Sequence, residues 1–234
     1  MKTGIIGAMS VETDALKAMV EHPVRETVSG VEFVSGRMFG EEVVVAQCGI
    51  GKVFAALCAQ TMLLRFGVDR IINVGVAGSL SPKLGLLDIA VSDGVVEHDI
   101  DTSPLGDPVG LISGINLVTL PASAELTEEV VKAAKAMGKN CVRGVIASGD
   151  QFIADSGRKA FIAEHFGAIA CDMEGAAIGH VCHVNGVPFT VIRSISDNAA
   201  EEAGSMEYPE LCRHAAKQSQ ELMTLLLSGT KASD

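Results

Sequence analysis

The stretch 171–200 places the charged side chains of Glu174, Arg193 and Asp197 among small and apolar residues. Arg193 falls inside the apolar run VPFTVIRSIS, a pattern typical of a buried strand. A guanidinium removed from water needs a carboxylate or a bound ligand beside it to offset the lost hydration. Glu12 and Glu174 are the candidates for that partner. The pattern therefore predicts either a structural ion pair or a polar site inside an apolar core.

Polar or glycine residues follow five of the expected strands. Glu12 comes after the first strand, and the other four sets are Gly75–Ser79, Ser148–Phe152, Glu174 and Ser196-Asp197. In open α/β sheets, ligands bind beyond the carboxyl ends of the strands, so we expect these side chains to converge there. Asp197, within SDN after a strand, would equally serve as the N-cap of a helix.

Other site patterns are incomplete. GIGKVF at 49–54 begins like a dinucleotide fingerprint, but Phe54 stands where the third glycine should be. No GxxxxGK(S/T) loop and no GxSxG nucleophile motif is present in the sequence. His180 and His183 lie three apart on an expected helix, and such a pair is more typical of packing than of a metal site. The sequence therefore predicts no cofactor and no metal.

The elements that must position these residues alternate between strands and helices, which is the signature of an α/β domain. The segment 32–48 alternates in polarity and turns at Phe39-Gly40, as an antiparallel hairpin does, so the sheet should be mixed. Further strands are expected at 3–8, 70–80, 87–96, 141–148, 168–173 and 187–196.

Helical patterns fill the intervals between the strands. Ser10 or Thr13 should cap the first helix, and Gly67 should end the second. The helices are expected from about residue 10, over 52–66, near 123–137, near 157–166, over 175–184 and from about 207 to 227. We therefore predict a single three-layer domain over residues 1–234, with a central mixed sheet flanked by helices.

Composition excludes several classes of partner. The formal charge is −11 without any cluster of lysine or arginine, whereas nucleic acids and anionic membranes need a basic footprint. The longest apolar runs fall well short of the roughly 20 residues of a membrane span, and the run after Lys2 is too short for a secretory signal. The six cysteines show no CxxC spacing, as expected of reduced thiols. We therefore expect a soluble, cytoplasmic protein with a small neutral or zwitterionic ligand.

The segment 97–114 contains EHDID followed by several Pro, Gly and Asp residues, which predicts a long loop. Long loops inside compact domains tend to be functional or interfacial. We expect this one to be either a solvated loop or part of an interface.

Motifs spread over nearly the whole chain make it resemble the 5′-methylthioadenosine/S-adenosylhomocysteine nucleosidases, which have a nucleoside phosphorylase-like α/β fold. Each glycine turn alone is unspecific, but MEGAAI, VPF and IRSISD together separate this family from unrelated α/β proteins. The motifs are GIIGAM with Glu12, GIGKV at 49–53, INVGVAG at 72–78, SDGVVEHD at 92–99, RGVIASGDQFI at 143–153, DMEGAAIGHVCH at 172–183, VPFTVIRSISD at 187–197 and AAKQS at 215–219.

The resemblance implies hydrolysis of the bond between adenine and a 5′-thio-substituted ribose. It implies that Glu12 activates the attacking water, that Arg193 helps to position water and carboxylates, and that Asp197 protonates the purine at N7. Met173 and Glu174 would hold the ribose. The other substrate-binding residues that it implies are Ala77 and Gly78 beside sugar and base, Phe152 stacking on the base, the Ile153 backbone at the adenine edge, and Met9, Ile50 and Ser196.

Cleavage of the N-glycosidic bond requires the same division between a proton donor and a negatively charged group. Cleavage leaves a purine with excess electron density and a sugar that resembles an oxocarbenium ion, so the site must deliver a proton on one side and negative charge on the other. Burial beside other carboxylates raises the pKa of an aspartate or glutamate. Asp197 would then arrive protonated while a better-paired glutamate stays ionised.

The chain departs from the family pattern at a few positions. The family commonly has serine where this chain has Val76, and glutamate where it has Asp172, a change that we take as minor. Leu105 stands where an aromatic residue is usual, in the loop that in the family reaches a neighbouring subunit's pocket, and Tyr208 stands where phenylalanine covers the 5′ substituent. The resemblance and the 97–114 loop together predict a homodimer, and they leave the 5′ group open between methylthio, homocysteinyl, deoxy and futalosine-type substituents.

Two other functions remain as alternatives. A purine nucleoside phosphorylase of the same fold would use phosphate, but Glu12 would repel the dianion and the turn GAMSVE holds no arginine, which favours water. A non-catalytic nucleoside-binding module would tolerate the loss of carboxylates, whereas Glu12, Glu174 and Asp197 are all present.

Overall fold

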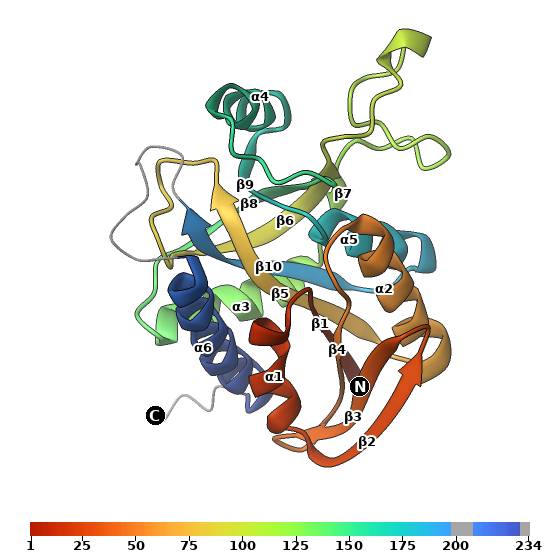
Figure 1. The fold of residues 1–234 in the computed structure, drawn as a ribbon, viewed down its shortest axis with the longest axis vertical. Coiled ribbons are helices and arrows are strands. Elements are labelled where there is room, and N and C mark those ends of the chain that lie inside the picture. Colours follow the sequence, from red (N-terminus) through yellow and green to blue (C-terminus); the bar gives the residue numbers. More distant parts are fainter. Residues whose placement is uncertain (198–207, 230–234) are drawn as a thin grey trace.

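The computed structural model describes residues 1–197 and 208–229, with the side chains of Asp197 and Tyr208 outside that description. Figure 1 shows strands and helices that alternate along the chain around a twisted sheet. The strands are β1 (Lys2–Gly7), β2 (Glu21–Val28), β3 (Val31–Met38), β4 (Glu41–Gln47), β5 (Arg70–Ser79), β6 (Ile89–Glu97), β7 (Leu120–Pro121), β8 (Cys141–Ser148), β9 (Ala168–Asp172) and β10 (Phe189–Asp197). The helices are α1 (Ser10–Ala18), α2 (Lys52–Phe66), α3 (Ala124–Ala136), α4 (Ser156–Phe166), α5 (Gly175–Asn185) and α6 (Tyr208–Leu227).

The sheet is mixed and partly closed on itself. Its strands follow the order β10-β6-β8-β9-β5-β1-β4-β3-β2, and β10 also pairs with β5. That extra pairing closes β5, β10, β6, β8 and β9 into a ring, from which β1, β4, β3 and β2 continue as an open sheet. Strand β5 runs parallel to β1 and β10 and antiparallel to β9. The predicted central mixed sheet is confirmed, and the ring is an addition that no single strand pattern reveals.

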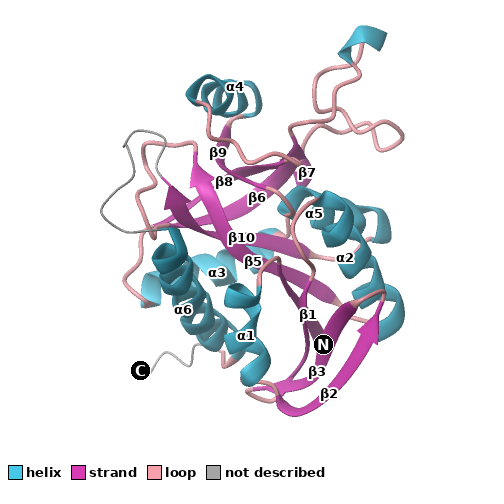
Figure 2. Cartoon of the chain, in the orientation of Figure 1, coloured by secondary structure: helices cyan, strands magenta, loops and turns pink. Residues whose placement is uncertain are grey.

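Helices cover both faces of the sheet because its central strands are apolar on both faces. Successive side chains of a strand point to opposite faces, and Ile71 and Ile72 accordingly belong to different apolar clusters. The cluster of Ile71 includes residues of α2 and α5, whereas the cluster of Ile72 includes residues of α1, α3 and α6. Figure 2 shows α1 and α6 together on one side of β5, with α2 and α5 together on the other. The three-layer arrangement is therefore confirmed.

Several local predictions are also confirmed. Residues 31–47 form the antiparallel hairpin β3–β4, and α2 ends at Gly67, which adopts the left-handed conformation with φ 61°. The sequence reasoning missed β2, whose residues are mostly exposed and include Pro23, so it shows no alternation of buried and exposed positions. It also missed β7, which has two residues.

The predicted cap of α1 is wrong. The helix begins at Ser10, so this residue lies within the first turn, and Thr13 Oγ1 donates to the Met9 carbonyl oxygen instead of accepting from the start of the helix. Glu12 caps the helix in their place, because its Oε2 accepts from the backbone N–H groups of Ala8 and Met9 at 2.8 and 2.9 Å. This is the backward-reaching half of a capping box: the side chain at the third helical position accepts from the N–H of the N-cap residue Met9, whereas a short cap would accept from N–H groups inside the first turn.

The remaining features concern thiols, membrane spans and the long loop. Cys58 and Cys182 are buried, as expected of packed thiols, and burial raises the pKa of each thiol to about 12. Within the described residues, no helix combines the length and apolarity of a membrane span. The predicted loop after β6 extends away from the sheet (Figure 1) and leaves Leu105 84% exposed.

We predict that Ile72→Ala lowers the free energy of unfolding by about 2–5 kcal/mol, because it opens a cavity beneath α1 and α6. Val24→Ala, at a 64% exposed position of β2, should change it by no more than about 0.5 kcal/mol. Urea unfolding of both variants at equal protein concentration measures this. An Ile72→Ala midpoint equal to that of the wild type would contradict the two-sided core.

Candidate active site

A cavity of about 140 Å³ opens where β1, β5, β8, β9 and β10 end. Side chains from segments far apart in sequence meet there, as expected from the rule that ligands of α/β sheets bind beyond the carboxyl ends of the strands. The lining residues are Ala8, Met9, Glu12, Ile50, Val76, Ala77, Gly78, Gln151, Phe152, Ile153, Cys171, Asp172, Met173, Glu174 and Ser196.

Glu12 is held on the floor of this cavity by backbone donors. Besides the two N–H groups at the start of α1, the Val76 N–H donates to Oε1 at 3.2 Å. A Cβ atom on Gly75 would lie 3.0 Å from the same Oε1, so glycine is needed for the carboxylate to approach β5. Burial raises the pKa of Glu12, although the N–H donors and Arg193 oppose it. The site thus contains a fixed carboxyl group with increased proton affinity.

Glu174 is the second buried carboxylate, at the turn between β9 and α5. Its Oε1 accepts from the Gly51 N–H at 2.9 Å, which places it at the start of α2. Burial first, and then repulsion by Asp172, raise the pKa of Glu174 to about 7, while Arg193 and the Gly51 N–H act in the opposite direction. Near neutral pH this group therefore changes its charge readily.

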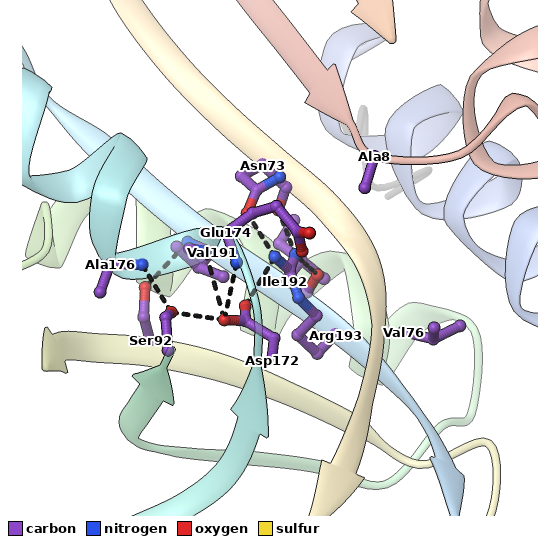
Figure 3. Close-up of polar contacts among 12 residues, drawn as sticks. Ala8, Asn73, Val76, Ser92, Asp172, Glu174, Ala176, Val191, Ile192 and Arg193 are labelled. Carbon is purple, nitrogen blue, oxygen red and sulfur yellow. Dashed lines mark hydrogen bonds and ion pairs between the residues drawn. The ribbon is translucent and has the colours of Figure 1, made fainter. Parts of the chain in front are cut away.

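Arg193 lies behind the cavity wall and is 1% exposed. Its Nη2 contacts Asp172 Oδ2 at 2.6 Å and Asn73 Oδ1 at 2.5 Å, and its Nη1 donates to the Ile192 carbonyl oxygen at 2.9 Å (Figure 3). The expectation that Glu12 or Glu174 is the direct partner is wrong, because the carboxylate that the fold places against the guanidinium is that of Asp172. The guanidinium charge still acts on both through space.

Asp172 is a cavity residue whose contacts sequence reasoning undervalued. Besides pairing with Arg193, it accepts through Oδ1 from the Ser148 hydroxyl and from the N–H groups of Glu174 and Gly175. Ser148 Oγ in turn accepts from the Ala176 N–H at 2.7 Å. These bonds satisfy the free donors at the start of α5 and so fix the turn that carries Glu174. An aspartate at the end of a strand, shortly before a helical GAA, was the available signal.

The structure brings together most of the predicted substrate-binding residues and separates a few. Leu105 lies on the extended loop, away from the cavity, and Arg193 is not among the lining residues. Asp197 pairs through its backbone with Gly78 at the cavity edge, while its side chain and that of Tyr208 lie outside the described part of the chain. The lining residues that had not been assigned a binding role are Ala8, Val76, Gln151, Cys171 and Asp172.

The lining divides into an acidic floor and an apolar wall. Glu12, Asp172 and Glu174 supply the acidic groups, and Met9, Ile50, Phe152, Ile153 and Met173 supply most of the apolar surface. None of the lining residues, all from the described part of the chain, is a lysine, arginine or histidine. Such a cavity suits a flat apolar group on one side and a centre of developing positive charge on the other.

Known proteins match the chain over nearly its whole length. The family model of the phosphorylase superfamily matches residues 2–228. A 5′-methylthioadenosine/S-adenosylhomocysteine nucleosidase of Shewanella sediminis is 41% identical over 205 residues, which cover 87% of this chain and 89% of the relative. One from Shewanella putrefaciens is 38% identical over 233 residues, which cover 99% of this chain and 100% of the relative.

Solved structures give the same result. The Campylobacter jejuni 5′-methylthioadenosine/S-adenosylhomocysteine nucleosidase superposes with a TM-score of 0.92 at 31% identity, covering 97% of this chain and 99% of the other. The futalosine hydrolase of Helicobacter pylori superposes with a TM-score of 0.89 at 37% identity, covering 97% of both chains. Because the family model and the relatives match nearly the whole chain, and the fold agrees with theirs, the chain belongs to the phosphorylase superfamily, in the family of the 5′-methylthioadenosine/S-adenosylhomocysteine nucleosidases.

Proposed function

We propose that the chain hydrolyses the N-glycosidic bond of 5′-methylthioadenosine and S-adenosylhomocysteine, releasing adenine and the thioribose. The observation that carries this proposal is the cavity lining, in which the carboxylates Glu12 and Glu174 meet an apolar wall without any basic side chain. Family membership supports it independently.

The roles follow from where charge develops in the reaction. The ribose gains positive character as the bond breaks, so a nearby carboxylate stabilises it more in the transition state than in the substrate. Glu12, aimed by three backbone N–H groups, takes the proton of the attacking water. Glu174 and Met173 hold the ribose, and Phe152 and the Ile153 backbone hold the adenine.

Asp197 completes the scheme as the general acid that protonates purine N7. Its backbone ends β10 opposite Gly78, a cavity residue, which supports this assignment. Arg193 acts indirectly, because its contacts go to Asp172, Asn73 and the main chain. It holds the β9–α5 turn and adds positive charge behind the two glutamates.

Water is favoured over phosphate as the nucleophile by the same geometry. A phosphate dianion needs an arginine fork or several converging N–H groups. Here the N–H groups of Ala8 and Met9, just before α1, donate to Glu12, and the guanidinium of Arg193 is bound by Asp172 and Asn73. Val76, where the family commonly has serine, still gives Glu12 its backbone N–H.

A futalosine-type substrate is the second candidate, favoured by the likeness to the Helicobacter pylori futalosine hydrolase. Both substrates are purine ribonucleosides cleaved at the same N-glycosidic bond, and the 5′ group is one of the features that distinguish them. The residues expected beside that group are Leu105, which is 84% exposed on the 97–114 loop, and Tyr208, whose side chain lies outside the described part of the chain.

We also propose that the chain forms a homodimer through α2, α5 and the 97–114 loop. Large apolar side chains are exposed on all three, among them Val53, Leu57 and Leu64 on α2, Val184 on α5 and Leu105 on the loop. The helices α2 and α5 pack against each other, so these side chains belong to neighbouring elements. A second copy of the chain would bury them, which apolar surface favours.

Purified protein incubated with 5′-methylthioadenosine should release adenine and free methylthioribose, with and without phosphate. Futalosine and S-adenosylhomocysteine serve as parallel substrates. Chromatography with mass detection identifies the sugar. The sugar 1-phosphate would instead make the protein a phosphorylase, and release of the purine base from none of the three would refute the proposal.

Glu12→Gln and Asp197→Asn should each lower kcat by about 10²–10⁴-fold while retaining affinity for a non-hydrolysable substrate analogue, because each removes a proton-transfer group and not a binding contact. Stopped assays and calorimetry measure the two quantities. If a variant keeps the wild-type rate, the proton-transfer role assigned to that residue is wrong. If a variant loses only affinity, the residue is a binding residue instead.

Sedimentation velocity at micromolar concentration should show a dimer, and Leu57→Asp should shift it toward the monomer, because the new charge would be buried at the interface. Val24→Asp, on the exposed edge strand β2, is the matched control and should leave the dimer intact. A monomeric wild type would contradict the proposed assembly.

A further inference from the structure

Lys52, the first residue of α2, is bound at both its side chain and its backbone. Its Nζ contacts Glu97 Oε2 at 2.9 Å and Asp99 Oδ1 at 2.6 Å. Its backbone N–H donates to Asp150 Oδ1 at 2.7 Å. The side chains of Lys52, Glu97 and Asp99 are mostly buried. A residue tied in this way cannot move without breaking several bonds.

The acceptors of Lys52 are themselves bound to other elements. Glu97 Oε1 contacts His180 Nδ1 of α5 at 2.8 Å. Asp99 Oδ2 accepts from the Asp150 N–H at 2.9 Å. We call Lys52, Glu97, Asp99, Asp150 and His180 the Lys52 cluster. It joins α2, α5, the end of β6 and the turn after β8.

The Lys52 cluster lies next to two parts of the cavity in sequence. Gly51, whose N–H donates to Glu174, directly precedes Lys52. Gln151, Phe152 and Ile153, which line the cavity, directly follow Asp150. The residue at 51 must be glycine, because φ is +100° and a Cβ there would lie 3.0 Å from Asp150 Oδ1.

Electrostatics explain why a lysine stands in the middle. Glu97, Asp99 and Asp150 would repel one another if no cation lay between them. Burial lowers the pKa of Lys52, but the hydrogen bonds to Asp99 and Glu97 outweigh it and raise the pKa above its usual value, so the lysine is charged. The ammonium group thus keeps the carboxylates of Glu97 and Asp99 together, while the Asp150 carboxylate is held by the backbone N–H of Lys52.

We propose that Lys52 is a positioning residue for the glycosidic-bond reaction, fixing the first turn of α2 so that the Gly51 N–H stays on Glu174 and the Asp150–Ile153 segment stays against the cavity. The proposal rests on the proposed function, in which Glu174 holds the ribose and Phe152 the base. Lys52 itself touches no lining atom in this scheme and acts through Gly51 and Asp150.

Displacing the Gly51 N–H has a measurable effect on Glu174. The charged or titratable groups that face this carboxyl are Asp172, Arg193, Glu12 and Cys48, and none of them bonds to the Lys52 cluster. Loss of one N–H donor should therefore raise the pKa of Glu174 by about 0.5–1 unit, since each such bond favours the ionised form. In a plot of kcat/KM against pH, the acidic limb should move to higher pH by the same amount.

Lys52→Met tests the proposal, because methionine keeps the length of the side chain and removes its charge. We expect kcat/KM to fall about 10–100-fold, mainly through a higher KM, since the positions of Glu174 and Phe152 both contribute to binding. The acidic limb should move to higher pH. Glu97→Gln, which leaves Lys52 in place with a weaker partner, should change both quantities in the same direction by less.

Arg143→Met is the matched control, because Arg143 also contacts two carboxylates, Asp93 and Glu128, but on the exposed surface. It should leave KM and the acidic limb unchanged. The proposal is overturned if Lys52→Met and Glu97→Gln lose thermal stability but keep the wild-type KM and the wild-type acidic limb. Lys52 would then be a structural residue only.

A direct titration separates this proposal from the proposed function. Carbon-13 NMR of the Glu174 carboxyl, assigned with Glu174→Gln, measures its pKa whether or not the protein is active. A rise in Lys52→Met but not in Arg143→Met supports the positioning role even if no nucleoside is cleaved, and an unchanged value overturns it. If the wild type is active but Lys52→Met does not change the Glu174 titration, the proposed function stands and the positioning role is refuted.

Discussion

The buried pair of Arg193 and Asp172 is the interaction on which the site depends. Both side chains are about 1% exposed, so each charge requires the other. Removing one partner from such a pair typically costs about 3–5 kcal/mol, because the remaining charge is left without compensation. The pair also connects β10 with β9, on the two sides of β5, and Asp172 passes that restraint on to the start of α5. Glu174 is held in its place as a result.

Both glutamates of the site double as helix caps. Glu12 satisfies donors at the start of its own helix, and Glu174 satisfies the Gly51 N–H at the start of α2. Helix N-termini favour negative charge, whereas burial favours the neutral acid. The two effects oppose each other, and burial prevails in both groups. The backbone therefore fixes where these carboxylates point, while the surrounding apolar side chains set how tightly they hold a proton.

The sequence predicted the fold class and most of the cavity because both depend on local patterns. Val- and Ile-rich runs revealed the central strands, and the residues that follow them, Glu12 and Glu174 among others, met where parallel strands end. Contacts between distant segments were not predictable in this way. The partner of Arg193 was wrong because a single sequence does not show which carboxylate the fold brings nearest. The cap of α1 was wrong because Glu12, three residues inside the helix, displaced the short side chains that usually cap.

The ring closure of the sheet has a consequence for how the protein is made. Asn73 and Arg193 form hydrogen bonds although they are 120 residues apart in sequence. During synthesis, β5 therefore cannot complete its pairing until β10 has been made. Until then, one edge of β5 is an unpaired strand, the kind of surface on which nascent chains aggregate. Contacts so distant also slow folding, since the intervening loop must be closed before they form. Ribosome-bound chains that end before β10 therefore lack both Arg193, the buried partner of Asp172, and the protection of their central strand.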